Sequence, residues 1–337
     1  MTNKYPIDIV IPWVDGNDPE WQTSFKKYSI NETAKDDNSV IRYRDWDNVQ
    51  YVFRGIEKFA PWVNKVHFIT NGQTPKWLNL DAPKLNFVKH DDFIPKEWLP
   101  TFSVRPIELN LHRIESLSER FIYFNDDFFI TSPVTEKRFF KRGLPCDIAV
   151  LDALMPTVPR RMVLLNDVAA VNRHFDKRRV VRANWSKWYN LKYGSILWRT
   201  IALTPWSRFS GFRNTHLPQP YLKSVISEVW EHEENVLVST CSHRFRDISD
   251  LNQSVFRFWQ LASGRFYPTN VIKRTNVTSS KSVTDHNIES VADDIIKQKY
   301  DLMVLNDSDD IADFEKSKAI LNNAFQKILP EKSSFEI

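Results

Sequence analysis

The segment that most constrains the fold of this chain is Ser118–Ser132, which reads SERFIYFNDDFFITS. An apolar run, Phe121–Phe124, leads into Asn125, Asp126 and Asp127, and apolar residues resume directly afterwards. Short apolar runs rich in aromatic and β-branched residues are typical of buried strands. Two adjacent carboxylates at the end of such a strand are costly unless a cation or hydrogen-bond donors compensate them. The segment predicts a buried strand with a polar tip, although an ordinary turn capped by Asp127 explains the same tip.

Other segments repeat this pattern of a strand followed by a polar tip. The apolar residues 7–12 lead into Trp13, Val14 and a turn, residues 66–70 lead into a second tip, and residues 300–305 lead into another Asn-Asp pair. Ligands of open α/β sheets gather at the carboxyl ends of strands, so several of these tips are expected at one sheet edge. The further tip positions are Asp15, Gly16, Asp18, Asn71, Gly72, Asn306 and Asp307.

The order of the elements predicts an α/β fold. Strand signals alternate with helix signals, as in a mixed sheet flanked by helices with right-handed crossovers. One expected helix begins with Asp47 as its N-cap, carries apolar residues at helical spacing and stops at Pro61. We expect residues 1–150 to form the ligand-binding core, residues 151–213 to form a largely helical insertion and residues 214–337 to complete the same site.

The charge of the chain is distributed unevenly. The formal net charge is only +4, but twelve Lys and Arg between Arg160 and Arg213 face only two Asp, a local balance of +10 that leaves −6 elsewhere. The segment also holds an aromatic-basic run, Trp185–Tyr193. Such asymmetry indicates a polyanion, a phosphate-bearing substrate or an anionic membrane face, with a solvated helical face as the alternative. No nucleic-acid-binding motif accompanies it, so nucleic acid is not expected as a partner.

Cysteine content and hydropathy predict the compartment. Cys146 and Cys241 are the two cysteines, too few for a disulfide framework, which fits a reducing environment. The N-terminus has no secretory signal, and no apolar run reaches about 18 residues. We therefore expect a cytoplasmic protein that is neither secreted nor membrane-spanning, with peripheral contact to the inner membrane face as an option for the basic segment.

Two loop residues are candidates for proton transfer and phosphate binding. His216 lies in a loop just before an expected helix, where its imidazole is exposed enough to exchange protons. Arg246, or its neighbour Arg244, offers a planar cation suited to phosphate. A structural histidine and surface ion pairs are the alternatives for these residues.

Four blocks of the sequence stand out as long runs of distinctive residues. The first reads IDIVIPWVDGNDPEW from residue 7, and the second runs from RYRDWDN at residue 42 to ERFIYFNDDFF at residue 129. The third runs from HLPQPYLKSVI at residue 216 to RFRDISDLNQSVFRFW at residue 259, and the fourth begins with VLNDSDDI at residue 304, so roughly residues 140 to 210 lie outside the blocks. In this order they resemble the blocks of the Stealth family of sugar-1-phosphate transferases. That family includes bacterial capsule-type enzymes and the catalytic subunit of the lysosomal-enzyme N-acetylglucosamine-1-phosphotransferase.

The resemblance implies a glycosyltransferase-A-like, Rossmann-like core and transfer of a sugar together with its proximal phosphate. The donor would be a nucleotide sugar, such as a UDP-linked hexose or N-acetylhexosamine, and a nucleoside monophosphate would be released. The acceptor would be a hydroxyl of an oligosaccharide or polysaccharide, itself potentially a polyanion. The oligomeric state is left open.

The resemblance also assigns roles to individual residues. The family's functional positions fall on Asn125, Asp127, His216, Arg246 and Asn306. His216 would be the base that takes the acceptor proton, and Arg246 would stabilise the transferred phosphoryl group. Mg²⁺ or Mn²⁺ would be held by Asp127 with Asn306 or Asp307. The nucleotide-binding positions would be Trp13, Val14, Asp15, Gly16, Asp18, Arg44, Asn71 and Gly72.

One departure and two rival functions remain open. Ile11-Pro12-Trp13 stands where a Thr usually precedes the Trp, so a nucleotide contact at this position is expected to depart from the family pattern. A true glycosyltransferase would use the same pocket but release a nucleoside diphosphate. A non-catalytic module that binds polyanions through the basic segment would consume no nucleotide sugar and would have no use for the Asn-Asp tips.

Overall fold

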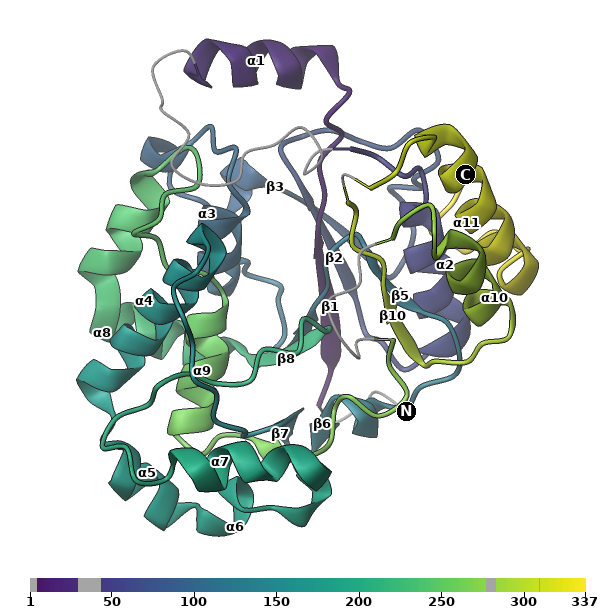
Figure 1. Ribbon diagram of the computed structural model, residues 1–337. Coiled ribbons are helices and arrows are strands. Elements are labelled where there is room, and N and C mark those ends of the chain that lie inside the picture. Colours follow the sequence, from purple (N-terminus) through teal and green to yellow (C-terminus); the bar gives the residue numbers. More distant parts are fainter. Residues whose placement is uncertain (1–4, 30–43, 277–282, 309) are drawn as a thin grey trace.

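The central sheet has five strands in the order β3-β2-β1-β4-β8. The computed structural model describes residues 5–29, 44–276, 283–308 and 310–337 (Figure 1). All six residues of β1 are buried, as expected of a parallel strand that is covered on both faces. The strands of this sheet are β1 (Ile7–Pro12), β2 (Val66–Thr70), β3 (Leu85–Lys89), β4 (Arg120–Tyr123) and β8 (Gln219–Leu222).

The connections of the sheet reverse direction between β1 and β4. From β1 the chain passes to β2 and β3 on one side, and it returns to β4 on the other side of β1. β1 is parallel to β2 and β4, and β2 is parallel to β3, whereas β8 runs antiparallel to β4. Ligands bind beside such a reversal, outside the carboxyl ends of the strands. The predicted mixed α/β sheet is confirmed, and the edge at which this rule places a ligand lies where β1 and β4 end.

Helices cover both faces of the sheet. Figure 1 shows α2, α10 and α11 on one side of β1, and α3, α4, α8 and α9 on the other. α2 is the helix predicted after Asp47, and its apolar face is buried, but its N-cap is Asn48. Asp47 has a φ of 50°, outside the extended region that N-caps favour. The helices of the described residues are α1 (Pro19–Ser29), α2 (Val49–Phe59), α3 (Val104–Leu109), α4 (Pro159–His174), α5 (Lys177–Ala183), α6 (Trp185–Trp188), α7 (Leu197–Leu203), α8 (Lys223–Ser242), α9 (Ser254–Ala262), α10 (Ile288–Ile296) and α11 (Phe314–Ile328).

Two smaller sheets adjoin the central one. β5 (Phe128–Ile130) starts directly after the Asn-Asp-Asp tip and pairs antiparallel with β10 (Leu302–Val304). β10 is therefore the centre of the strand predicted over residues 300–305, and it lies outside the central sheet. The other small sheet contains β6 (Phe140–Lys141), β7 (Leu144–Asp147) and β9 (Tyr267–Pro268).

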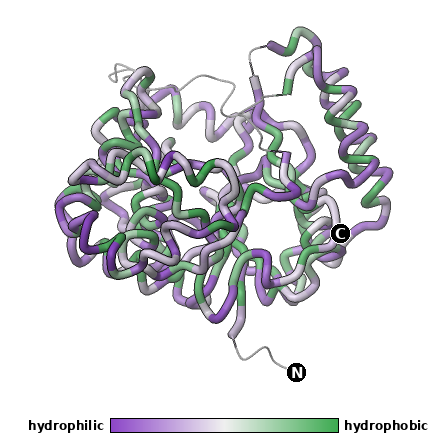
Figure 2. The backbone as a smooth tube through the Cα atoms, turned by 60° about the horizontal axis from the view of Figure 1, so that its bottom comes forward, coloured by the Kyte–Doolittle hydropathy of each residue, from purple (hydrophilic) through white to green (hydrophobic). Residues whose placement is uncertain are grey.

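Residues 151–213 contain α4 to α7. α4 packs against the rest of the fold, since the Asp167 carboxylate accepts the N–H of Asn252 at 3.0 Å just before α9. α5, α6 and α7 lie together at the end of the molecule opposite α1 (Figure 1). Hydrophobic and hydrophilic residues alternate along the helices (Figure 2), and none of the helices that the structure describes is long and apolar enough to cross a membrane.

Candidate active site

The Asn-Asp-Asp tip leaves the central sheet directly after β4. Phe124 still belongs to the sheet, because its N–H donates to the carbonyl of Val10 at 2.9 Å. Residues 125–127 are half-buried, and the N–H of Phe128 donates to the carbonyl of Asn125 at 3.2 Å. The segment is thus both a tight turn and the polar tip of a buried strand.

Strand β10 brings the second Asn-Asp pair to this tip. Val304 is paired with Phe128, so the residues that follow β10 run beside the residues that precede β5. The N–H of Leu305 donates to the carbonyl of Asp127 at 3.0 Å. Asn306 directly follows this contact, and the structure therefore joins two candidate residues that lie far apart in the sequence.

His216 reaches the same edge because β8 is antiparallel to β4. The residues before Gln219 consequently lie beside the residues after β4. His216 Nε2 is 3.0 Å from Asn306 Oδ1, and the imidazole meets the Phe128 ring edge-on at 5.4 Å between centroids. The backbone of His216 has a φ of 44°, and its N–H donates to Asn214 Oδ1 at 3.1 Å. Left-handed backbone at a non-glycine residue costs free energy and is concentrated at functional sites.

Arg44 and Asp307, predicted to serve nucleotide and cation, bind each other. Arg44 Nε donates to Asp307 Oδ2 at 2.8 Å, and Nη2 donates to Oδ1 at 2.5 Å. Nη2 also reaches the carbonyl of Ser308 at 3.1 Å, and the guanidinium lies 4.4 Å from the ring centroid of Phe314. This two-pronged pair fixes the loop that carries Asn306.

Trp13 and Val14 extend the β1 end into the tip. The N–H of Trp13 donates to the carbonyl of Ile69 at 2.9 Å, and its ring stacks on Phe68 with centroids 5.7 Å apart. Val14 packs against a small aromatic cluster beneath α1. Both side chains are half-buried, so each has a packed face and an accessible face.

The β1 and β2 tips are tied together by Gln73. Its side chain accepts the N–H of Asp15 and donates to the Asp15 carbonyl, both at 2.9 Å. Gly72, whose N–H donates to Thr70 Oγ1 at 2.9 Å, has a φ of 112° that favours glycine. Asn71, which lies between Thr70 and Gly72 in the sequence, is exposed. Gln73 was not among the predicted site residues; its signal was its position in the same tip loop.

Asp18 and Gly16 form the start of α1. The Asp18 carboxylate accepts the N–H groups of Glu20 and Trp21 at 2.8 and 2.9 Å, and these bonds hold its pKa below the usual range. The Gly16 carbonyl accepts the side chain of Gln22 at 3.0 Å. The Asp18 carboxylate therefore already caps the start of α1. A nucleotide that contacts this carboxylate would have to share it with the two backbone N–H groups.

Arg246 approaches this edge from the segment after α8. It is half-buried, and its charge, with that of Arg105, favours the ionised form of Glu108. Burial outweighs these charges and raises the pKa of Glu108, which accepts the hydroxyl of Tyr123 at 2.9 Å. Arg246 is thus within electrostatic reach of Glu108, whose partner Tyr123 is the last residue of β4.

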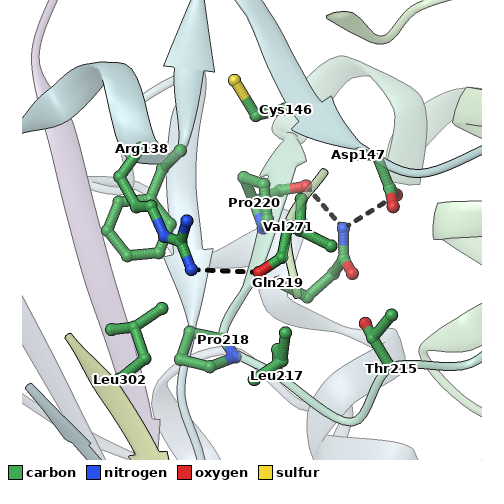
Figure 3. Close-up of a pocket in the computed structure, with 11 residues that line it drawn as sticks. Arg138, Cys146, Asp147, Thr215, Leu217, Pro218, Gln219, Pro220, Val271 and Leu302 are labelled. Atoms are coloured by element: carbon green, nitrogen blue, oxygen red, sulfur yellow. Dashed lines mark hydrogen bonds between the residues drawn. The ribbon is translucent and has the colours of Figure 1, made fainter. Parts of the chain in front are cut away.

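A small cavity lies behind the His216 loop (Figure 3). Its volume is about 20 Å³, which holds about one water molecule and no sugar. Gln219 donates to Asp147 Oδ2 and to the Pro220 carbonyl at 3.3 Å each, and Arg138 donates to the Val271 carbonyl at 3.0 Å (Figure 3). The cavity is thus part of the packed wall that supports His216.

Family comparisons agree with the blocks read from the sequence. Residues 5–33 match Stealth protein CR1, conserved region 1, and residues 42–146 match Stealth protein CR2, conserved region 2. The capsular polysaccharide phosphotransferase WcwK of Streptococcus pneumoniae is 40% identical over 341 residues, which cover 100% of this chain and 99% of that protein. The chain belongs to the Stealth family. This Stealth protein is accordingly an enzyme of the phosphotransferase kind.

Two other relatives of the Stealth protein align over similar lengths. The receptor polysaccharide phosphotransferase WefC of Streptococcus oralis is 38% identical over 349 residues, covering 98% of this chain and 99% of the relative. The exopolysaccharide phosphotransferase cps2G of Lactiplantibacillus plantarum is 35% identical over 339 residues, covering 99% and 97%. These alignments cover nearly the whole chain, so they include residues 140–210, which lie outside the four blocks of the sequence analysis.

Carboxylates crowd the tip of the Stealth protein. Burial, reinforced by the charge of Asp127, raises the pKa of Asp126 to about 7. Burial also raises the pKa of Asp45, although the N–H of Asp47 donates to its carboxylate at 2.8 Å. Asp45 and Asp15 repel each other electrostatically. Asp45 was not predicted as a site residue; its signal was the polar run that ends the segment before α2.

The oxygen donors at the tip fit a cation that binds together with substrate. Within the part of the chain that the structure describes, no three His, Cys, Asp or Glu side chains converge as a metal site. Asp127 offers carboxylate oxygens, the Asn306 amide oxygen is shared with His216 Nε2, and both Asp307 oxygens already accept from Arg44. Mg²⁺ commonly keeps several waters and binds one or two carboxylates plus substrate phosphates. The donor set of this Stealth protein suits that mode of binding.

Proposed function

We propose that this enzyme transfers a sugar-1-phosphate from a nucleotide sugar to a hydroxyl of a capsular, cell-wall or exopolysaccharide acceptor. The donor is a UDP-linked hexose or N-acetylhexosamine, and the released product is a nucleoside monophosphate. The single observation that carries this proposal is the contact of His216 Nε2 with Asn306 Oδ1 at 3.0 Å, beside Asp127. This contact places a group that can accept a proton beside side-chain oxygens that can bind a cation, at the edge where α/β sheets bind ligands.

The core is glycosyltransferase-A-like in this proposal. The strand order β3-β2-β1-β4, with β8 antiparallel at the edge, supports this assignment, because nucleotides bind beside a reversal such as the one between β1 and β4. The tips of β1 and β2, linked through Asp15 and Gln73, hold the nucleotide. Residues 151–213 are an insertion into this core, and residues 214–337 complete its site.

His216 acts as the general base. Because the Asn306 oxygen only accepts, Nε2 carries the hydrogen in their contact and Nδ1 carries the lone pair. The acceptor hydroxyl loses its proton to His216 while its oxygen attacks the phosphorus that bears the sugar. The bond from that phosphorus to the bridging oxygen breaks, and the nucleoside monophosphate leaves with this oxygen. The sugar keeps its bond to the transferred phosphate, so the product is a phosphodiester.

Charge on the transferred phosphoryl group is stabilised by Arg246 and by a cation. Asp127 and Asn306 would hold Mg²⁺ or Mn²⁺, which neutralises charge on the diphosphate when bound. Arg44 keeps Asp307 and the Asn306 loop in place through its two hydrogen bonds. Electron paramagnetic resonance of Mn²⁺ should detect tight binding only with donor present, and Asp127→Asn should weaken it. Undiminished Mn²⁺ binding in that variant would remove Asp127 from the cation site.

A panel of nucleotide sugars tests the reaction. Each is incubated with enzyme, Mg²⁺ and oligosaccharide acceptor, and the released nucleotide is identified by chromatography. We expect one donor to yield nucleoside monophosphate in step with a phosphodiester signal in the phosphorus NMR spectrum of the product. Release of nucleoside diphosphate would instead identify the rival, a glycosyltransferase. Binding of polymer without consumption of any nucleotide sugar would identify the non-catalytic module.

The helical end of the insertion supports peripheral binding to an anionic membrane on the cytoplasmic side. Trp185, Trp198 and Trp206 are 65%, 60% and 57% exposed, and Leu191 is 87% exposed. With Ile201 they form what we call the basic-aromatic end, within a segment whose balance is +10. Trp is enriched at membrane interfaces, and each Lys or Arg near an anionic leaflet contributes about 1 kcal/mol. Leu191 and Ile201 favour lipid over sugar, since aliphatic side chains do not stack on sugars.

Vesicle flotation tests this membrane contact. The protein should float with vesicles that contain an anionic phospholipid and not with purely zwitterionic ones, and added salt should release it. The double variant Trp198→Ser/Trp206→Ser should lose most of this binding, whereas Leu80→Ser, at an exposed apolar residue outside the basic-aromatic end, should not. Vesicle binding of the double variant equal to that of wild type would contradict the membrane contact. So would a result in which the acceptor polysaccharide, and not the vesicles, covers these tryptophans.

A further inference from the structure

A buried ion pair lies beside the loop that carries His216. Arg257 of α9 is 4% exposed, and Asp147, the last residue of β7, is 2% exposed. Arg257 Nε donates to Asp147 Oδ2 at 2.8 Å, and Nη2 donates to Oδ1 at 2.9 Å. Two parallel bonds of this kind fix both the position and the orientation of the guanidinium. Neither residue is among those predicted from the sequence for the candidate site.

The remaining arm of the guanidinium holds the start of the His216 loop, residues 213–219. Arg257 Nη1 donates to the carbonyl of Arg213 at 2.8 Å. The N–H of Arg213 donates in turn to the carbonyl of Val150 at 2.8 Å. The loop therefore starts from a residue whose backbone N–H and carbonyl are both held by buried parts of the fold.

Asp147 holds the other end of the same loop. Its Oδ2 accepts the side chain of Gln219, the first residue of β8, at 3.3 Å (Figure 3). Gln219 is also paired with Tyr123, the last residue of β4. One ion pair thus connects the residue three positions before His216 with the residue three positions after it.

The backbone between these two anchors needs such support. His216 has a φ of 44°, and a left-handed backbone at a non-glycine residue persists only where the surrounding structure over-determines it. Its sequence neighbours Thr215 and Leu217 are buried and line the small cavity in Figure 3. A change in the separation of the anchors would consequently move the imidazole away from Asn306, which it meets at 3.0 Å.

We propose that Arg257, together with Asp147, is a positioning residue of this enzyme. The ion pair sets the separation of the two ends of the His216 loop and thereby holds His216 Nε2 against Asn306. Its effect on the reaction rests on the proposed function, in which His216 takes the acceptor proton, whereas the placement of the imidazole does not depend on that role. Arg257→Lys keeps the positive charge but cannot reproduce the two parallel bonds to Asp147 while also holding Arg213.

Nitrogen NMR of the histidine rings in the full chain tests this placement, with the His216 signals assigned through His216→Gln. In wild-type protein the hydrogen should reside on Nε2, because the Asn306 oxygen accepts it. Arg257→Lys should give a mixture of the two tautomers. Its turnover number should fall by about 10- to 100-fold, whereas the dissociation constant of the donor should change by less than about twofold. Gln219→Met, which leaves the ion pair intact but removes the bond from the loop end to Asp147, should show a smaller effect in the same direction.

A second buried arginine fork provides the matched control. Arg54 donates to the two carboxylate oxygens of Glu336, at 2.8 and 2.6 Å, and to the carbonyl of Leu329 at 2.9 Å. Arg54→Lys therefore removes the same kinds of bond, and none of them involves the His216 loop. This variant should lose melting temperature as Arg257→Lys does, but it should keep the wild-type His216 tautomer and turnover number.

The outcomes separate this inference from the proposed function. A wild-type His216 tautomer in folded Arg257→Lys would overturn the inference, and if that variant does not fold, the same result in Gln219→Met would overturn it. An equal tautomer mixture in Arg54→Lys would also overturn it, because the effect would then follow from lost stability alone. A tautomer mixture in Arg257→Lys with an unchanged turnover number would preserve the placement of the imidazole and overturn the role of His216 as the base.

Discussion

At the scale of single residues, the candidate site depends on contacts that hold His216 in one orientation. The ring is held by Asn306 and Phe128, and its backbone lies in the left-handed region at a φ of 44°. Left-handed backbone is concentrated at functional sites, but four other non-glycine residues that the structure describes also adopt it. The contacts of the ring, more than the backbone, therefore support a chemical role for His216.

Replacing His216 by Ala should lower turnover far more than donor affinity. General base catalysis contributes about 10²- to 10⁴-fold, and we expect the turnover number to fall by that factor. Donor dissociation constants, measured by calorimetry, should change by less than about threefold, because the proposed function places the donor on the β1 and β2 tips and not on His216. His286→Ala serves as the exposed control. Equal weakening of turnover and donor binding would indicate a binding role for His216.

The sequence could predict these residues but not their contacts. The apolar run that ends in Asn125 and Asp127 is a local signal, and so is the loop position of His216. The pairing of Arg44 with Asp307 depends on two segments that are distant in sequence, and no local pattern encodes it. The burial that leaves Asp126 with a pKa of about 7 likewise follows from packing of the whole edge.

At the scale of elements, α2 and β5 position the Asn-Asp-Asp tip by an unusually close approach. A Cβ atom on Gly55 would lie 2.6 Å from the carbonyl oxygen of Ile130, inside van der Waals contact. The absence of a side chain at this position lets the helix pack directly on the strand that follows the tip. Gly55 is thus a packing residue that supports the site from behind.

Gly55→Ala should destabilise the protein despite the higher helix propensity of Ala. The propensity gain is about 1 kcal/mol, whereas overpacking against backbone costs about 1–3 kcal/mol. We expect a lower urea midpoint, measured by circular dichroism, and lower activity because β5 must shift. A variant as stable as wild type would show that α2 and β5 can separate without cost.

Element prediction succeeded where the pattern was local and failed where pairing was long-range. α2, β1, β2 and β4 follow from hydrophobic periodicity and breakers within each segment. The antiparallel direction of β8 and the pairing of β10 with β5 could not be predicted, because both depend on partners far along the chain. These two pairings bring His216 and Asn306 to the tip. The sequence could therefore predict which residues belong to the candidate site, but not which of them contact each other.

At the scale of the whole molecule, the half-buried His112 couples stability to pH. Burial, with the charges of Arg113 and Lys223, lowers the pKa of His112 to about 4 from 6.5. Its ring packs beside Trp230 at 5.7 Å between centroids. Between these two pKa values the unfolded chain binds the proton more readily, so stability is full above about pH 6.5 and is lost as the pH falls towards 4.

His112→Phe should reduce this acid sensitivity. Phe retains the packing against Trp230 and cannot take up a proton. The difference in unfolding free energy between pH 7 and pH 4.5, measured by urea denaturation, should shrink by about 1–3 kcal/mol. His286→Phe, at an exposed histidine, should leave the difference unchanged. An unaltered difference in His112→Phe would mean that His112 is protonated without cost in the folded state.

The central claim, that the sugar and its proximal phosphate move together, is tested most directly by the fate of that phosphate. A nucleotide sugar labelled with radioactive phosphorus only in the phosphate next to the sugar is incubated with enzyme and polysaccharide acceptor. The proposed reaction predicts that the label enters the polysaccharide and that the released nucleotide is an unlabelled monophosphate. Label recovered in a released nucleoside diphosphate, with none in the polysaccharide, would contradict it.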